Sequence, residues 1–200
     1  MNRGVDRSEA LQALHGHLTD ELVVAALGNA AYDLFNAGDR DEHFYMWGAM
    51  GLGISVGLGV AMTVPDARVI ALDGDGAALM NLGTLATVGT LAPPNLTAII
   101  FDNRSYDLTG AQPTATEYGA DLAAVARACG IARVEQVETQ QDFESLIPRM
   151  LDEDGPWCIV VETLPTSPDR KKPLVALRRR FVRTEEFTDT AIAVSRGGAS

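Results

Sequence analysis

One strand–turn–helix–strand unit in the middle of the chain limits what the whole can fold into. Arg68–Leu72 is a short apolar run that predicts a buried strand, Gly74-Asp75-Gly76 breaks it, and helical spacing follows over Ala77–Thr90. Leu96–Phe101 is a second apolar run, and Asp102-Asn103 ends it. A strand, a helix and a second strand in this order form a right-handed crossover between parallel strands. Asp75 and Asn103 are therefore expected to meet at the carboxyl edge of one sheet.

Further strands and helices alternate along the chain, which predicts an α/β fold with a doubly wound, mostly parallel sheet. The other expected strands are Glu21–Leu27, Ile131–Val134 and Trp157–Glu162. The other expected helices are Arg7–Leu18, Ala30–Asn36, Leu52–Thr63, one capped by Asp121 that ends at Gly130, and one from Thr139 or Gln141 to Leu151. Residues 1–165 are expected to form one domain. Residues 166–200 are expected to be a charged C-terminal arm, with a short helix at Leu174–Arg183.

The two motifs at the predicted strand ends carry chemistry that fits a diphosphate and a metal ion. Backbone N–H groups of a glycine turn that leads into a helix suit a phosphate. Mg²⁺ prefers octahedral oxygen ligands, and the Asp75 carboxylate, the Asn103 amide oxygen and a backbone carbonyl near Ser105 could supply three of these beside phosphate oxygens and water. Either motif alone is more often an ordinary turn or strand end. Together they predict a site for a diphosphate and a metal.

At these residues the sequence resembles the diphosphate-binding domain of thiamine diphosphate enzymes, in which Gly-Asp-Gly is answered downstream by an Asn pair, here Asp102-Asn103. Trp47-Gly48-Ala49-Met50-Gly51 matches a second motif of that family. The resemblance implies that Gly48 gives a backbone carbonyl to the cofactor's exocyclic amine and that Met50 bends the cofactor into its reactive shape. It implies thiamine diphosphate and Mg²⁺ as cofactors. The implied cofactor contacts are Asn29, Gly48, Met50, Gly74, Asp75, Gly76, Ala77, Asn103, Ser105 and Tyr106, and the implied metal ligands are Asp75, Asn103 and Ser105.

Three further segments resemble the sulfopyruvate and phosphonopyruvate decarboxylases: Phe44 to Gly59, Gly83–Thr87 and Thr109–Thr114. Thr109 and Gln112, from the last segment, are expected to contact substrate. The chain also departs from that pattern. Ala77 replaces a Ser, Asp102 replaces the first Asn of the pair, Ala111 replaces a Gly, and Asn29–Asp33 stands where a Ser-Arg-Glu sequence is usual. Asn29 itself is expected either to contact the cofactor or to cap the helix that follows it.

The resemblance implies a β-type subunit of a two-subunit decarboxylase that converts a small 2-oxo acid into an aldehyde and CO₂. The activating Glu of such enzymes lies in a pyrimidine-binding domain, for which 200 residues leave no room, so an α-type partner subunit and a hetero-oligomer are expected. The alternatives are a carboligase subunit of the acetolactate synthase kind, an oxidoreductase β subunit and a non-catalytic cofactor-binding subunit. Two cysteines provide too few ligands for an iron–sulfur cluster, which disfavours the oxidoreductase.

Composition excludes several other classes of protein. A net charge of −11 argues against nucleic-acid binding, which relies on basic side chains. The longest apolar run, Ala49–Val64, has sixteen residues with four glycines and is too short to span a membrane, so we expect a cytoplasmic protein. Residues 170–183 hold seven basic and no acidic side chains, and we expect them to dock on an acidic partner or to form a solvated tail.

Overall fold

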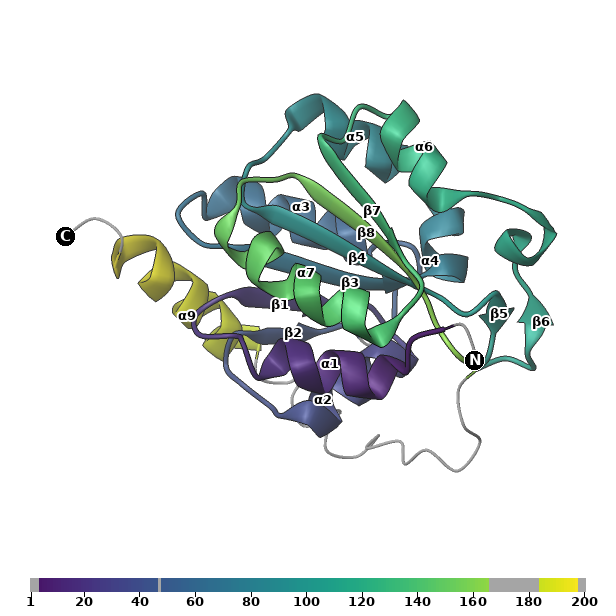
Figure 1. The fold of residues 1–200 in the computed structure, drawn as a ribbon. Helices are drawn as coiled ribbons and strands as arrows, with labels where there is room; N and C mark the ends of the chain where they lie inside the picture. The colour runs from purple at the N-terminus through teal and green to yellow at the C-terminus, as the bar shows by residue number, and fades with distance from the viewer. Residues whose placement is uncertain (1–3, 47, 166–183, 198–200) are drawn as a thin grey trace.

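The computed structural model describes residues 4–46, 48–165 and 184–197. Its centre is a six-stranded sheet in the order β2-β1-β3-β4-β8-β7, and every pair of neighbours is parallel (Figure 1). The strands are β1 (Leu22–Ala25), β2 (His43–Tyr45), β3 (Val69–Gly74), β4 (Leu96–Asp102), β7 (Arg133–Val137) and β8 (Trp157–Glu162). The predicted α/β class and parallel sheet are confirmed.

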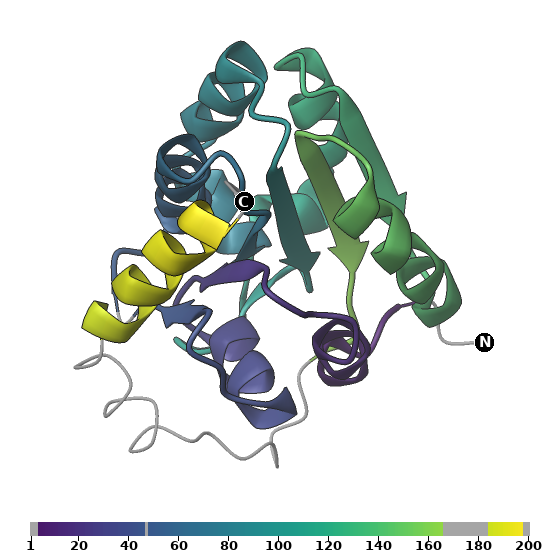
Figure 2. The same ribbon diagram turned by 90° about the vertical axis from the view of Figure 1, so that its left-hand side faces the viewer.

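Helices cover both faces of this sheet, as a doubly wound fold requires (Figures 1 and 2). One face is covered by α1 (Arg7–His15), α2 (Asn29–Ala37) and α7 (Gln140–Asp152). The other is covered by α3 (Gly53–Thr63), α4 (Asp75–Met80), α5 (Gly83–Leu91), α6 (Leu122–Ala128) and α9 (Thr184–Gly197). Because successive strand side chains point to opposite faces, Val23 and Val24 lie in different cores, and both are fully buried. The predicted cap Asp121 is present and accepts from the backbone N–H of Ala124. Of the two expected starts of α7, Thr139 is the residue that caps the helix, and its side chain accepts from the N–H of Asp142.

The predicted single helix over Ala77–Thr90 is wrong, because the chain forms two helices that break after Met80. Asn81, at the break, donates a hydrogen bond from Nδ2 to the carbonyl of Gly51 at 3.1 Å and lies 3.2 Å from Ser55 Oγ. Because these contacts hold Asn81 against the start of α3, α4 ends at Met80 and α5 begins at Gly83. The predicted bounds of the strand Ile131–Val134 are also wrong, since β7 runs from Arg133 to Val137. Gly130, with a φ of +83°, turns the chain out of α6 first.

The C-terminal helix α9 lies within the segment predicted to be a charged arm. It packs beside β2, where the rings of Phe187 and Phe44 have centroids 5.3 Å apart, and Phe187 and Ala191 are buried in the core (Figure 2). The expected helix at Leu174–Arg183 and the basic run 170–183 lie outside the described residues. The domain boundary at residue 165 stays a prediction.

Near the N-terminus the chain is fixed to the end of β8. Val5 forms an isolated parallel bridge with Thr163, with its N–H bonded to the carbonyl of Glu162 at 2.8 Å. The described part of the N-terminus therefore lies at the carboxyl edge of the sheet (Figure 1). In the described part of the chain, no helix is both long and apolar enough to cross a membrane.

Candidate functional site

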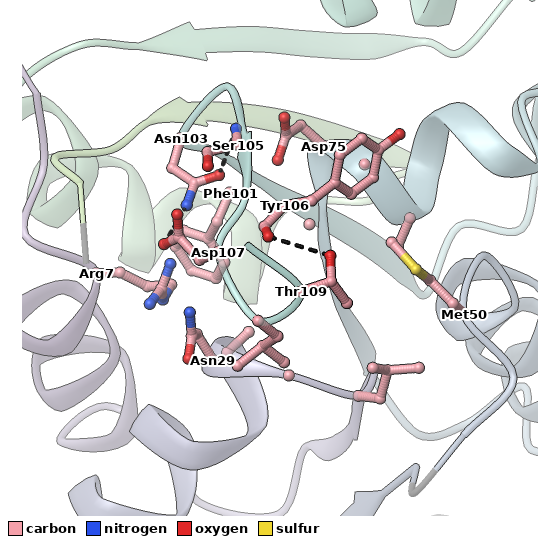
Figure 3. A pocket seen from close by; sticks show the side chains of 17 residues that line it. Arg7, Asn29, Met50, Asp75, Phe101, Asn103, Ser105, Tyr106, Asp107 and Thr109 are labelled. Carbon is pink, nitrogen blue, oxygen red and sulfur yellow. Dashed lines mark hydrogen bonds between the residues drawn. The ribbon is translucent and has the colours of Figure 1, made fainter. Parts of the chain in front are cut away.

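A cavity opens at the carboxyl edge of the sheet, where β1, β3 and β4 end. Gly74 pairs in register with Phe101, so Asp75 and Asn103 follow at the ends of neighbouring strands, as the crossover predicts. The sequence-predicted residues that line this cavity are Asn29, Met50, Gly74, Asp75, Gly76, Ala77, Asn103, Ser105, Tyr106 and Thr109 (Figure 3).

Two predicted site residues are not part of the cavity lining. Gly48 is exposed, and Gln112 is exposed on the hairpin formed by β5 (Ser105–Tyr106) and β6 (Gln112–Pro113). The Gln112 side chain turns back on its own loop and donates to the carbonyl of Thr109 at 3.4 Å. The cavity also contains residues that the sequence analysis did not predict, among them Arg7, Leu27, Phe101, Asp107 and Leu108.

Asp75 is buried, with 2% of its surface exposed, and two threonine hydroxyls hold its carboxylate. Thr114 donates to Asp75 Oδ2 at 2.5 Å, and Thr116 Oγ1 lies 3.3 Å from the same oxygen and 2.8 Å from Asp102 Oδ1. Burial raises the pKa of Asp75 to about 6; the hydrogen bond from Thr114 opposes this shift and the nearby charge of Asp102 adds to it. Both threonines lie about forty residues downstream, so no local pattern could have revealed their role.

Asn103 is held at both ends of its side-chain amide. Oδ1 accepts from the backbone N–H of Ser105 at 3.1 Å, and Nδ2 donates to Asp107 Oδ2 at 2.7 Å (Figure 3). Between them Arg104 has a φ of +59°, a left-handed conformation that turns the chain sharply after β4. The segment that follows contains the short β5–β6 hairpin.

The cations near the cavity each have an acidic partner. Arg104 is half-exposed and pairs with Glu162 at 3.3 Å, and it is not among the residues that line the cavity. Arg7 does line the cavity, and its Nε lies 2.8 Å from Asp33 Oδ2, with side chains that are 5% and 0% exposed. Among the described residues that line the cavity, Arg7 is the only Lys or Arg.

The start of α2 excludes one of the two expectations for Asn29. Gly28, with a φ of +110°, is the residue that caps α2, and no side chain caps this helix. Asn29 is instead its first residue and lines the cavity. The capping interpretation is therefore wrong, and contact with a cofactor stays a prediction.

Glycines allow close packing at two points around the site. A Cβ on Gly76 would lie 2.3 Å from Cε1 of Tyr106, so the tyrosine ring rests directly on the Gly-Asp-Gly turn. A Cβ on Gly53 would lie 2.9 Å from Oδ2 of Asp73, a buried carboxyl behind the cavity whose Oδ1 accepts from the N–H of Gly74. Burial raises the pKa of Asp73 to about 7, against opposing backbone hydrogen bonds from Gly74 and Ile54.

The donors at this edge fit a hard cation. Within the described residues, no group of three or more His, Cys, Asp or Glu side chains could hold a metal ion. The oxygen donors at this edge include the carboxylates of Asp75 and Asp107, the amide oxygen of Asn103 and the backbone carbonyls of the residues that follow Asn103. A set of oxygen donors suits Mg²⁺ rather than a soft metal. Oxygen atoms of a bound molecule would have to complete it.

Comparison with known proteins agrees with this geometry. The chain is 41% identical to the phosphonopyruvate decarboxylase of Streptomyces viridochromogenes in an alignment 201 positions long, which covers 97% of this chain and 50% of that protein. It is 37% identical to the sulfopyruvate decarboxylase subunit beta of Methanocaldococcus jannaschii in an alignment 165 positions long, which covers 81% of this chain and 87% of that subunit. The chain thus spans about half of the first relative and most of the second.

A solved structure has the same fold. The thiamine diphosphate-dependent 4-hydroxybenzoylformate decarboxylase of Rhodococcus jostii RHA1 matches with a TM-score of 0.67 at 21% identity, over 83% of this chain and 34% of that one. The family model for the thiamine pyrophosphate enzyme, C-terminal TPP binding domain, matches residues 28–161. The chain therefore belongs to the thiamine pyrophosphate enzymes and carries their C-terminal cofactor-binding domain.

Proposed function

We propose that the chain is the β-type subunit of a two-subunit thiamine diphosphate-dependent decarboxylase. Its substrate is a small 2-oxo acid of the sulfopyruvate or phosphonopyruvate type, and its products are an aldehyde and CO₂. The observation that carries the proposal is the meeting of Asp75 and Asn103 in one cavity with the Gly74–Ala77 turn. The names of the relatives support the reaction and the division into subunits.

In this proposal Mg²⁺ is held by the Asp75 carboxylate, the Asn103 amide oxygen and the backbone carbonyl of Ser105, together with phosphate oxygens. Ala77 has no hydroxyl, so the phosphate is bound through backbone N–H groups at the start of α4, which have no partner within the helix. Tyr106, which packs on Gly76, and Asn29, at the start of α2, complete the cofactor's surroundings. When bound, thiamine diphosphate supplies the carbanion that adds to the 2-oxo group and the electron sink that permits loss of CO₂.

Met50 supports the cofactor with its apolar side chain, which lines the cavity and is 36% exposed. We assign to Gly48 a contact from its backbone carbonyl to the cofactor's exocyclic amine, on the family resemblance alone, since Gly48 lies outside the lining of the cavity. Leu52, close by in the chain, is 42% exposed, so the Met50 loop presents apolar surface. We assign this surface to contact with the pyrimidine-binding α-type partner, which supplies the activating Glu.

The second acidic group of the substrate requires a cation. Arg104 is paired with Glu162, and Arg7 is paired with Asp33 inside the domain. The Ser-Arg-Glu sequence of the related decarboxylases is replaced here by residues that include Ala30 and Ala31. We therefore assign the cation that binds a sulfonate or phosphonate to the partner subunit.

Calorimetric titration of thiamine diphosphate with Mg²⁺ tests the site. The chain is titrated alone and then together with a candidate pyrimidine-binding subunit. Asp75→Ala is compared with the control Asp121→Ala, which removes the carboxylate that caps α6, away from the cavity. We expect binding that needs the partner, disappears in Asp75→Ala and persists in Asp121→Ala. Absence of binding in both settings would overturn the cofactor assignment.

The reaction is tested on the assembled pair with a panel of 2-oxo acids that includes sulfopyruvate and phosphonopyruvate. We expect release of CO₂ and of the corresponding aldehyde. Formation of an acetohydroxy acid from pyruvate instead would identify a carboligase. Rapid decarboxylation by the purified single chain would refute the two-subunit arrangement.

A further inference from the structure

We infer that Asp107 is a positioning residue of the metal site: it holds the side-chain amide of Asn103 so that its oxygen, and not its nitrogen, is presented to the cation. This inference rests on the proposed function, in which Asn103 is a ligand of Mg²⁺. Asp107 lies between the segments Asp102–Tyr106 and Thr109–Thr114 and belongs to neither of the motifs that carry the family resemblance.

The problem that Asp107 solves is the symmetry of an amide. The oxygen and the NH₂ group of Asn have nearly the same size and shape, but only the oxygen can bind a metal ion. A rotation of the terminal torsion by half a turn would place two N–H donors where the cation is to sit. A ligand Asn therefore needs partners that distinguish its two ends.

Both ends of Asn103 have such a partner. The N–H of Ser105 can only donate, and it lies 3.1 Å from Oδ1; the carboxylate of Asp107 can only accept when ionised, and it lies 2.7 Å from Nδ2. In the flipped orientation the NH₂ group would face the Ser105 N–H and the oxygen would face the carboxylate, so both contacts would become repulsive. The Ser105 contact leaves Oδ1 a second lone pair for a cation.

The local fold returns Asp107 to Asn103 four residues later. The left-handed Arg104 reverses the chain, and β5 then pairs with β6. The carbonyl of Tyr106 accepts from the N–H groups of Thr109 and Ala111, both at 3.1 Å, which fixes the turn that begins at Asp107. Asp107 is partly buried, and Arg7 lines the same end of the cavity (Figure 3).

Two substitutions separate orientation from charge. Asp107→Ala removes the acceptor, and we expect the Mg²⁺ dissociation constant to rise about 10-fold or more, the usual effect of losing a residue that orients a metal ligand. Asp107→Asn keeps an oxygen that accepts from Asn103 Nδ2, and we expect a rise of less than about 3-fold. Equal weakening by both substitutions would show that Asp107 acts through its charge or as a ligand, which overturns the inference.

A change of the ligand gives the decisive control. In Asn103→Asp both ends of the side chain are oxygens, so orientation no longer matters. We expect Asp107→Ala to weaken Mg²⁺ binding no further in this background, as a double-mutant cycle would show. The same loss in both backgrounds would overturn the inference. Mg²⁺ affinity is measured by calorimetry on the full chain with thiamine diphosphate and the partner that supports its binding.

A measurement without metal separates this inference from the proposed function. In ¹⁵N spectra of the metal-free chain, the side-chain amide of Asn103, assigned by its loss in Asn103→Asp, should show one proton shifted by the bond to the Asp107 carboxylate. The shift should disappear in Asp107→Ala and persist in Asp107→Asn. An amide signal unchanged in Asp107→Ala would overturn the inference. A different result is possible: the shift is lost in Asp107→Ala, but the wild-type chain binds no cofactor, alone or with a partner. That result would contradict the proposed function and would still establish the contact between Asp107 and Asn103.

Discussion

The buried pair of Arg7 and Asp33 permits a quantitative prediction about stability. Its nitrogen and oxygen lie 2.8 Å apart, and the two side chains are 5% and 0% exposed. Asp33→Asn keeps the shape of the side chain but removes the negative charge that lies against the buried guanidinium of Arg7. Removing one partner of a buried pair typically costs about 3–5 kcal/mol. Because a chain of this size loses about 2–4 °C in melting temperature for each kcal/mol, we expect a drop of about 6–20 °C.

The double variant Arg7→Met/Asp33→Leu removes both charges and fills a similar volume with apolar groups. It should recover most of the loss, since an apolar pair often replaces a buried ion pair at no net cost. Unfolding in urea, followed by circular dichroism, gives the free energy of unfolding of the wild type, of Asp33→Asn, of the single variants Arg7→Met and Asp33→Leu, and of the double variant. A cost below about 1 kcal/mol for Asp33→Asn would refute the reasoning, because water in the cavity would then be solvating Arg7. A double variant as unstable as the sum of the two single variants would refute it as well.

Three further predictions concern the site. Gly76→Ala places a methyl group 2.3 Å from the Tyr106 ring and should weaken thiamine diphosphate binding at least 10-fold in calorimetry. Gly59→Ala is the control, because nothing lies within 4 Å of the added atom, and it should leave the affinity unchanged. Equal affinities of the two variants would contradict the packing of Tyr106 on Gly76. Because burial raises the pKa of Asp73 to about 7, the folded chain keeps a proton that the unfolded chain releases near pH 4, so stability should fall as pH rises from about 4 to about 7. Asp73→Asn should reduce this slope in urea unfolding and leave the share of Asp75, whose raised pKa of about 6 acts in the same direction. An unchanged slope would show that Asp73 contributes nothing to it. Met50→Ala should change the free energy of unfolding by less than about 1 kcal/mol, since Met50 is 36% exposed, yet lower decarboxylation by the assembled enzyme; full activity would exclude the proposed role.

The fold and the position of the site followed from local patterns in the sequence. Buried parallel strands are apolar on both faces, so they stand out as short hydrophobic runs between turns. The handedness of the crossover then brought Asp75 and Asn103 together without any knowledge of side-chain packing. The membership of the thiamine pyrophosphate enzymes, expected from two motifs, is confirmed.

The parts that the sequence did not reveal depend on contacts between distant residues. The break in the predicted helix arises because Asn81 bonds to Gly51, thirty residues earlier. The carboxylate of Asp75 is held by Thr114, thirty-nine residues later. Such pairings become visible only when the backbone has already brought the segments together. Helix α9 is different, because Phe187 and Ala191 at a spacing of four are an apolar pattern that could have indicated it.

The bridge between Val5 and Thr163 has a practical consequence for protein engineering. It places Val5 at the same edge of the sheet as the cavity, whereas α9 lies beside β2, toward the opposite end of the strands (Figure 1). A partner domain joined ahead of Val5 through a short linker would thus be tethered beside the site, at an effective concentration in the millimolar range. A bulky affinity tag joined ahead of Val5 would compete with that partner for space.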